Sequence, residues 1–192
     1  MNTRIAGLLV LAVITAGCSG KEPDQQATAS PEKTVHEMMI ERIDPDADAI
    51  WEIGNAAIDD QASIDPALMD EQTWAELAKA SKRMAIHAAV LAKLDPLTVT
   101  RPGVKIADEG MEGAPTPQQI QGHLDRDADV FRALAVALGD HSTELAAAAT
   151  AHDATATGRL INEMDGVCES CHLEFWYPEQ KAIIEQMGLL PK

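Results

Sequence analysis

Aromatic residues are scarce in this sequence, because Phe, Trp and Tyr together make up only 3% of its 192 residues. Hydrophobic residues nevertheless reach 46%, and alanine and leucine dominate among them. These two residues favour helices, whereas sheets usually draw on β-branched and aromatic side chains. No segment shows the alternating pattern of a strand. The composition therefore predicts an all-α fold in one domain of ordinary size.

Cysteine is also rare, with three in the whole chain: Cys18, Cys168 and Cys171. The first of them follows a segment with the layout of an export signal, which is Arg4, an apolar run over residues 5–16 and small residues just before the cysteine. The run is too short to span a bilayer comfortably, so a permanent transmembrane helix is the weaker interpretation. We predict that residues 1–17 are a signal peptide removed on export.

The segment ITAGC, residues 14–18, resembles a bacterial lipobox, in which the cysteine becomes the lipidated first residue of the mature protein. This resemblance predicts a lipoprotein signal peptide, lipidation at Cys18 and a periplasmic protein held at the membrane through its lipid. Thr15 stands where a large aliphatic residue is usual, and a plain secretion signal leading to a soluble periplasmic protein is the alternative. Residues 18–33 are polar and predict a flexible linker to a domain over residues 34–192.

Positive charge is scarce as well, since 15 Lys and Arg stand against 31 Asp and Glu and give a formal net charge of −16. Loss of Arg4 with the signal peptide changes this −16 to −17. Nucleic acid and anionic membrane surfaces are therefore disfavoured as partners, because their phosphates would be repelled. A basic partner protein is compatible with this charge, although a solvated acidic face without a partner is the commoner cause.

Apolar residues recur at three- and four-residue spacing in four segments, and each segment predicts an amphipathic helix. The segments cover residues 34–58, 70–94, 116–151 and from about 153 to the residues before Pro178. Pro45 interrupts the first segment and predicts a kink or a short break there. The third segment is predicted to run as a single helix through Gly139 to about Ala151.

The ends of these helices are marked by capping residues and by a long loop. Residues 95–115 are rich in proline and glycine and predict a loop between the second and third helices. Thr116 and Gln119 form a capping box that starts the third helix, and either Asp153 or Thr155 caps the fourth. The apolar tail AIIEQMGLLP predicts a short closing helix. Together these segments predict an antiparallel up-down-up-down four-helix bundle with a short C-terminal extension.

The segment GVCESCHLEF, residues 166–175, places two cysteines three residues apart and a histidine directly after the second. On a helix, Cys168, Cys171 and His172 project to one side. The two thiols can add to the two vinyl groups of haem while the neighbouring imidazole binds the iron, which is the chemistry of the C-x-x-C-H haem signature. The motif therefore predicts one covalently attached haem c.

Other uses of this cysteine pair fit the sequence less well. A redox dithiol would need a βαβ context and a cysteine at a helix N-terminus. A zinc site would need a fourth ligand, and no second Cys/His pair at finger spacing occurs in the sequence. A structural disulfide is disfavoured because the two cysteines are too close on one element to close a useful loop. Chance occurrence of the motif is the remaining alternative.

The stretch LAAAATAHDATATGRLINEMDGVCESCH, residues 145–172, closely resembles the end of class II c-type cytochromes, the cytochrome c prime group. The resemblance covers about residues 34–176. It implies a four-helix bundle with the attachment motif near the C-terminus of its last helix, haem thioethers at Cys168 and Cys171, and His172 as the proximal iron ligand. It also allows a homodimer, because members of the group are often dimers.

In such a bundle, the start of the first helix and the loop over residues 95–115 lie at the same end as the motif. Low-spin members of the family take a distal methionine ligand from the first helix, and Met39 fits the inward-facing stripe. The resemblance therefore implies Met39 as the distal ligand, with Met38 as the alternative and His36 ranked below both. Pairing of methionine with histidine raises the potential of the iron and suits an electron carrier. The predicted function is electron transfer with redox partner proteins, without enzymatic activity.

Two further functions stay open at the level of the sequence. If neither methionine binds iron, we expect a five-coordinate high-spin haemoprotein that binds small gases. Reduction of peroxide or nitrogen oxides ranks last, because no distal acid–base pair is evident. Around the haem, Arg42, Arg101 and Lys105 are candidates for contacts with its propionates, with solvated surface cations as an equal alternative.

Overall fold

The computed structural model describes residues 33–61, 63–107 and 109–187. Within these ranges the chain is helical, and its only β contact is an isolated bridge between Ile58 and Ile64. The elements are α1 (Val35–Met38), η1 (Met39–Ile43), α2 (Asp44–Ala57), η2 (Pro66–Leu68), α3 (Glu71–Leu91), α4 (Pro117–Arg126), α5 (Ala128–Thr150), α6 (Ala154–Phe175) and α7 (Pro178–Met187). The predicted all-α fold is confirmed. The predicted signal peptide, Cys18, the linker up to residue 32 and residues 188–192 lie outside the described residues.

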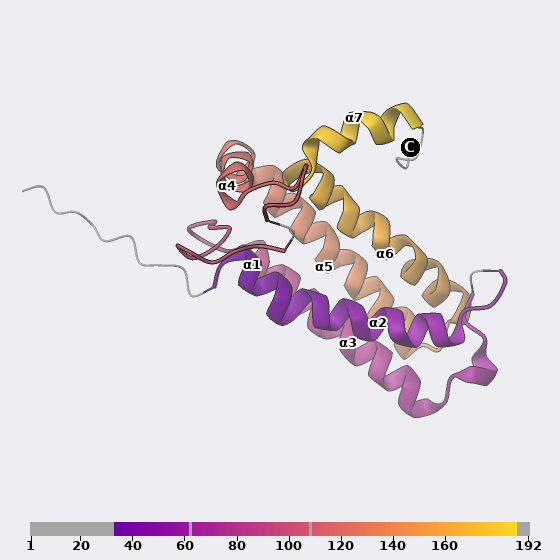
Figure 1. Ribbon diagram of the computed structural model, residues 1–192. Helices are drawn as coiled ribbons and strands as arrows, with labels where there is room; N and C mark the ends of the chain where they lie inside the picture. Colours follow the sequence, from indigo (N-terminus) through magenta and orange to yellow (C-terminus); the bar gives the residue numbers. More distant parts are fainter. Residues whose placement is uncertain (1–32, 62, 108, 188–192) are drawn as a thin grey trace, which may run out of the picture.

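Four long helices, α2, α3, α5 and α6, lie side by side in Figure 1. Helix α3 packs against α5, α5 against α6, and α2 against both α3 and α6. Each long helix therefore has two long neighbours, and the apolar side chains between them form the core. Helix α4 contacts α5 and α6 near one end, and α7 contacts α6. No helix in the described part of the chain is long and apolar enough to cross a membrane.

The first predicted helix forms as one continuous helix built from α1, η1 and α2. The predicted interruption at Pro45 takes the form of a π-helical turn over Met39–Ile43, in which the backbone N–H of Asp44 donates to the carbonyl of Met39, five residues back. A proline in a helix lacks an N–H, and its ring collides with the carbonyl four residues earlier. A wider π turn just before Pro45 gives that carbonyl room, so the helix continues without breaking.

The start of this helix is anchored to the loop that precedes α4. Thr34 and Glu37 form a capping box, in which each backbone N–H donates to the other's side-chain oxygen, at 2.8 Å and 3.2 Å. The backbone N–H groups of Val35 and His36 donate to carbonyls of residues 98 and 99 in the loop. These bonds hold the segment that carries Met39 beside the long loop.

Helix α2 is anchored independently, against α3 and α6. The buried carboxylate of Asp46 accepts a hydrogen bond from Arg83 at 2.7 Å and lies 2.9 Å from Nδ1 of His87, both on α3. On the side facing α6, Gly54 leaves no room for a side chain, because a Cβ there would lie 2.9 Å from Cγ2 of Ile161. The first helix is thus fixed at both ends, on either side of the π turn.

Glu37 is expected to stabilise the start of the helix in a pH-dependent way. Hydrogen bonds from Arg101, followed by those from Thr34, lower the pKa of Glu37 from 4.5 to about 2. Because the pKa is lowered, the stabilisation is complete above pH 4.5 and is lost as the pH falls through about 2. Glu37→Ala should lower the free energy of unfolding by roughly 1–2 kcal/mol at pH 7, as capping substitutions do.

Urea unfolding of Glu37→Ala and the wild type at a series of pH values measures this effect. The difference between the two proteins should shrink as the medium is acidified across that interval. Glu52→Ala is the matched control, because Glu52 is an exposed glutamate of α2 and no hydrogen bond or ion pair joins it to another described residue. A difference that stayed constant down to the lowest pH would contradict a role for the ionised carboxylate.

The prediction of a single third helix is wrong. Helix α4 ends at Arg126, Asp127 adopts non-helical angles of φ −127° and ψ 39°, and α5 begins at Ala128. The break carries no proline or glycine, so the sequence contained no breaker to indicate it. The predicted weak point, Gly139, lies instead inside α5, where its missing side chain faces Ala88 of α3. The capping box of Thr116 and Gln119 is confirmed.

The last two helices follow the sequence closely. Asp153 caps α6 by accepting a hydrogen bond from the N–H of Ala156 at 3.0 Å, which resolves the choice between Asp153 and Thr155. Helix α6 ends at Phe175, before Pro178 as predicted. A closing helix does form, but Pro178 is its first residue, so it begins before the predicted tail.

Candidate functional site

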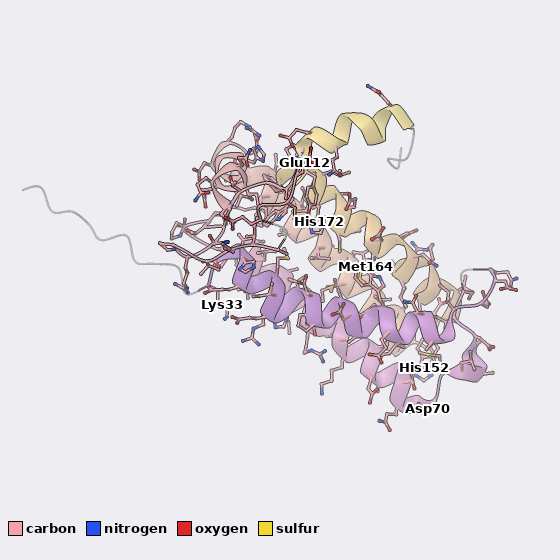
Figure 2. The ribbon with its side chains drawn as sticks, in the orientation of Figure 1. Lys33, Asp70, Glu112, His152, Met164 and His172 are labelled. Carbon is pink, nitrogen blue, oxygen red and sulfur yellow. The ribbon has the colours of Figure 1, made fainter. Side chains whose placement is uncertain are left out.

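The cysteine pair and His172 lie on the last turns of α6. Figure 2 shows His172 towards the end of the molecule where Lys33 precedes α1, with Met164 deeper along the same helix and His152 at the far end. Cys168 and Cys171 are half-buried free thiols, and the side chain of His172 is 45% exposed. Helical spacing therefore presents two sheltered sulfurs and one accessible imidazole on the same part of the helix.

The motif lies at a seam in the hydrophobic core. Buried residues form two separate clusters, one that includes Ile50, Leu77, Met84 and Met164, and another that includes Leu91, Leu124, Phe131 and Phe175. Cys168 packs against the first cluster and Cys171 against the second. Met39 packs against both. The two cysteines and Met39 therefore mark the boundary between the clusters.

Two hollows open at this seam. The smaller has a volume of about 90 Å³, and its lining is mostly apolar and includes Ile43, Trp51, Leu91, Leu138 and Cys168. The larger has a volume of about 230 Å³, and its lining includes His36, Ile106, Phe131, Trp176 and Tyr177. Four residues line both hollows: Met39, Asp44, Cys171 and His172. Together the hollows reach the lower end of the roughly 300–1,000 Å³ that is typical of small-molecule sites.

The structure separates the two candidate methionines. Met39 lines both hollows together with Cys171 and His172. Met38 is 2% exposed, belongs to the second core cluster and lines neither hollow. It fills the core, as a methionine on an apolar helical stripe usually does. His36, the third candidate, lines the larger hollow.

None of the three cations predicted to contact the propionates lines either hollow. Arg42 is exposed on η1. Arg101 donates to both carboxylate oxygens of Glu37, at 2.6 Å and 3.1 Å, and with Lys105 it lines a separate hollow of about 490 Å³ in the loop. In the described part of the chain, no lysine or arginine lines either hollow beside His172. Propionate contacts by Arg42, Arg101 and Lys105 stay predictions.

The two thiols stay protonated at neutral pH. Burial, with neighbouring carboxylates such as Asp165, raises the pKa of Cys168 to about 11. Burial, followed by the effect of Cys168, raises the pKa of Cys171 to about 12. A redox dithiol needs a thiolate of low pKa, usually at a helix N-terminus. These thiols lie near a helix C-terminus, where the helix dipole disfavours negative charge, so the geometry argues against a thioredoxin-like role.

Asp44 belongs to the site, although its local sequence pattern did not single it out. Asp44 follows the π turn and lines both hollows, and His172 and His36 lie near enough to influence its carboxylate electrostatically. Partial burial, with repulsion from Asp48, raises the pKa of the Asp44 carboxyl. His36 and Asp44 therefore share the larger hollow, whereas no acid–base pair was evident there from the sequence. Pro45 was the residue that could have indicated an unusual position for Asp44, because the helix widens into a π turn just before it.

No group of three or more His, Cys, Asp or Glu side chains gathers in residues 33–61, 63–107 and 109–187 in a way that could hold a metal ion. Comparison with protein-family models, with curated proteins and with solved structures found no match to this chain. The resemblance to class II cytochromes thus stays a prediction, and the site's own residues carry the functional argument.

Proposed function

We propose that this chain is a c-type cytochrome that transfers electrons through one covalently attached haem. Cys168 and Cys171 would form the thioethers, His172 would bind the iron as proximal ligand, and Met39 would bind it as distal ligand. One observation carries the proposal: Met39 lines the same hollow as both cysteines and His172, at the seam between the two core clusters.

The residues around the seam fit a haem. A haem is flat and largely apolar, and its propionates are its only charged groups, so it needs a slot between apolar layers. The smaller hollow lies between two such layers, because Leu138 of the first cluster and Leu91 of the second both line it, and the larger hollow adjoins the second cluster at Phe131. Haem would supply a redox-active iron there. The chain's own part is to fix it through two sulfurs, hold it between two side chains and keep water away.

The arrangement of the long helices supports the predicted four-helix bundle. Each of α2, α3, α5 and α6 packs against two of the others, and consecutive long helices are joined by connections at the ends of the bundle. We therefore take the fold to be an antiparallel up-down-up-down four-helix bundle with α7 as its extension. The start of the first helix and residues 106–107 of the loop then lie beside the motif, as the linings of the hollows indicate.

Electron transfer fits the site better than catalysis. A methionine on the distal side closes the position at which a substrate or gas would bind, and the His/Met pair is typical of electron carriers. The alternative is a five-coordinate haemoprotein that binds small gases, with Met39 beside the iron and not bonded to it. Attachment of haem through C-x-x-C-H requires an exported chain, so we also propose a periplasmic location. The segment ITAGC supports a lipid anchor at Cys18, and the net charge of −16 supports redox partner proteins that are basic.

Expression of the full chain, signal peptide included, in a bacterium that matures c-type cytochromes tests this function. We expect haem that stays on the chain after denaturing electrophoresis, and low-spin absorption spectra in both redox states. The oxidised protein should also show a methionine-to-iron charge-transfer band. Exported chain without covalent haem would contradict the proposal, and a high-spin spectrum that changes with carbon monoxide would favour the gas-binding alternative.

A further inference from the structure

Glu169 contacts the imidazole of His172 from outside the hollows. It precedes His172 by three residues on α6, and its Oε2 lies 3.7 Å from Nδ1 of the imidazole. Glu169 lines neither hollow, whereas His172 lines both. Its carboxylate forms no other ion pair within the described ranges. The ring nitrogen near Glu169 is therefore Nδ1, whereas Nε2 has no hydrogen-bond or ion-pair partner among the described residues.

We propose that Glu169 is a positioning residue for His172, an inference that rests on the proposed haem function. An imidazole that binds a metal through one nitrogen carries a proton on the other, and that N–H usually donates to a carboxylate or a carbonyl. The present 3.7 Å separation is longer than a hydrogen bond, which has a length of about 2.7–3.2 Å. Rotation of the half-exposed Glu169 side chain closes this gap, because no other described partner holds it.

A carboxylate on Nδ1 has two consequences for the site. It fixes the tautomer with the proton on Nδ1, so that the lone pair of Nε2 is free for the iron. It also makes the imidazole a more basic ligand, and a more basic ligand stabilises ferric over ferrous iron. Glu169 is thus expected to lower the reduction potential through His172, in addition to the effect of its charge alone.

The other carboxylates near the motif act differently. Asp165 and Asp44 influence Cys168 by charge, and Glu174 influences Cys171. Asp44 also interacts electrostatically with His172, but none of the three lies within ion-pair distance of the imidazole. Glu174 is paired with Lys181. Asp165 provides a matched comparison, because it is an acidic residue of the same helix, one turn before Glu169, with no contact to the imidazole.

The test compares full-length haem-loaded Glu169→Gln and Asp165→Asn with the wild type. Each variant removes one negative charge near the motif, but only Glu169→Gln weakens a hydrogen bond to His172. We expect the reduction potential of Glu169→Gln to shift to a more positive value, by clearly more than that of Asp165→Asn. In the Met39→Ala background, where the reduced iron would keep only His172, the iron–histidine stretching frequency should fall with Glu169→Gln and stay unchanged with Asp165→Asn.

The outcomes separate this inference from the function on which it rests. Equal shifts in the two variants, or none, would overturn the positioning role while covalent haem in the same samples leaves the proposed function standing. A wild-type chain without covalent haem would overturn both. Glu169 is half-exposed on a helix and glutamine is nearly as good a helix former as glutamate, so the variant is expected to fold.

Discussion

Met39→Ala is expected to turn the proposed low-spin, six-coordinate haem protein into a high-spin, five-coordinate one. Alanine removes the thioether, and the other distal candidates lie less favourably, since Met38 is buried in the core and His36 lines only the larger hollow. The oxidised variant should lose the methionine-to-iron charge-transfer band completely. Its reduced form should bind carbon monoxide, which the wild type should not. Absorption spectra of both redox states, with and without carbon monoxide, measure the change.

Met38→Ala is the matched control for this experiment. It removes the same side chain one residue earlier, from a position that is 2% exposed in the second core cluster. Truncation of a buried methionine usually costs about 2–5 kcal/mol, so this variant should unfold more easily and keep its low-spin spectrum. Met39→Ala should cost less stability, because Met39 is only partly buried. The opposite pattern, with the charge-transfer band lost in Met38→Ala alone, would move the ligand to Met38.

Joint replacement of Cys168 and Cys171 by alanine is expected to abolish covalent attachment. Each thioether needs one of these sulfurs, and no other described residue is a cysteine. Haem bound by this double variant should be removed by acidified acetone, whereas in the wild type it should stay with the chain. Each single replacement should leave one thioether and therefore a chain that still retains haem.

Ser170→Ala controls for disturbance of the helix between the two cysteines. The Ser170 hydroxyl donates only to the carbonyl of Gly166, one turn earlier, and the residue is exposed. This variant should keep its haem through the acetone treatment. Acid-resistant haem in the double cysteine variant would show that another side chain forms the bond, and the proposed attachment would then be wrong.

The sequence predicted the helices well because their periodicity and their caps agree. Apolar spacing located the long helices, the cap at Thr116 located the start of α4, and Asp153 was one of two residues predicted to cap α6. The break at Asp127 was missed because no proline or glycine accompanies it. Such a break depends on how α4 packs across the ends of α5 and α6, which is a tertiary effect that a local pattern does not contain.

Met39 was favoured because it lies on an apolar stripe of the first helix, and this stripe keeps facing the core only because of the π turn. The proposed stripe through Val35, Met39 and Ile43 advances in steps of four residues, and each such step rotates the face of an α-helix by roughly 40°. A regular helix would carry the stripe steadily away from the core. The π turn takes up this rotation, so that Met39 meets the seam while Val35 and Ile43 stay buried.

The charged residues of the site were the hardest to predict. Arg101 was a reasonable propionate partner by its position in the loop, but Glu37, 64 residues earlier, holds it in an ion pair. Pairings over such separations depend on the fold and leave no trace in local spacing. Glu169, in contrast, could have been found, because its spacing of three residues from His172 on a predicted helix already places the two side chains together.

The π turn also bears on how long the first helix can be. Between its anchors at Val35 and Asp46, the helix holds one residue more than an α-helix would need to join them in the same orientation. A chain that lacks one of residues 40–42, and in which alanine replaces Pro45, would close the turn into ordinary α-helix, with the Asp44 N–H still bonded to the Met39 carbonyl. A deletion within α2 would instead rotate the preceding helix by about 100° and turn Met39 away. Residues 40–42 are therefore where this helix can lose a residue and keep its orientation, and Pro45 is the residue that ties it to the longer form.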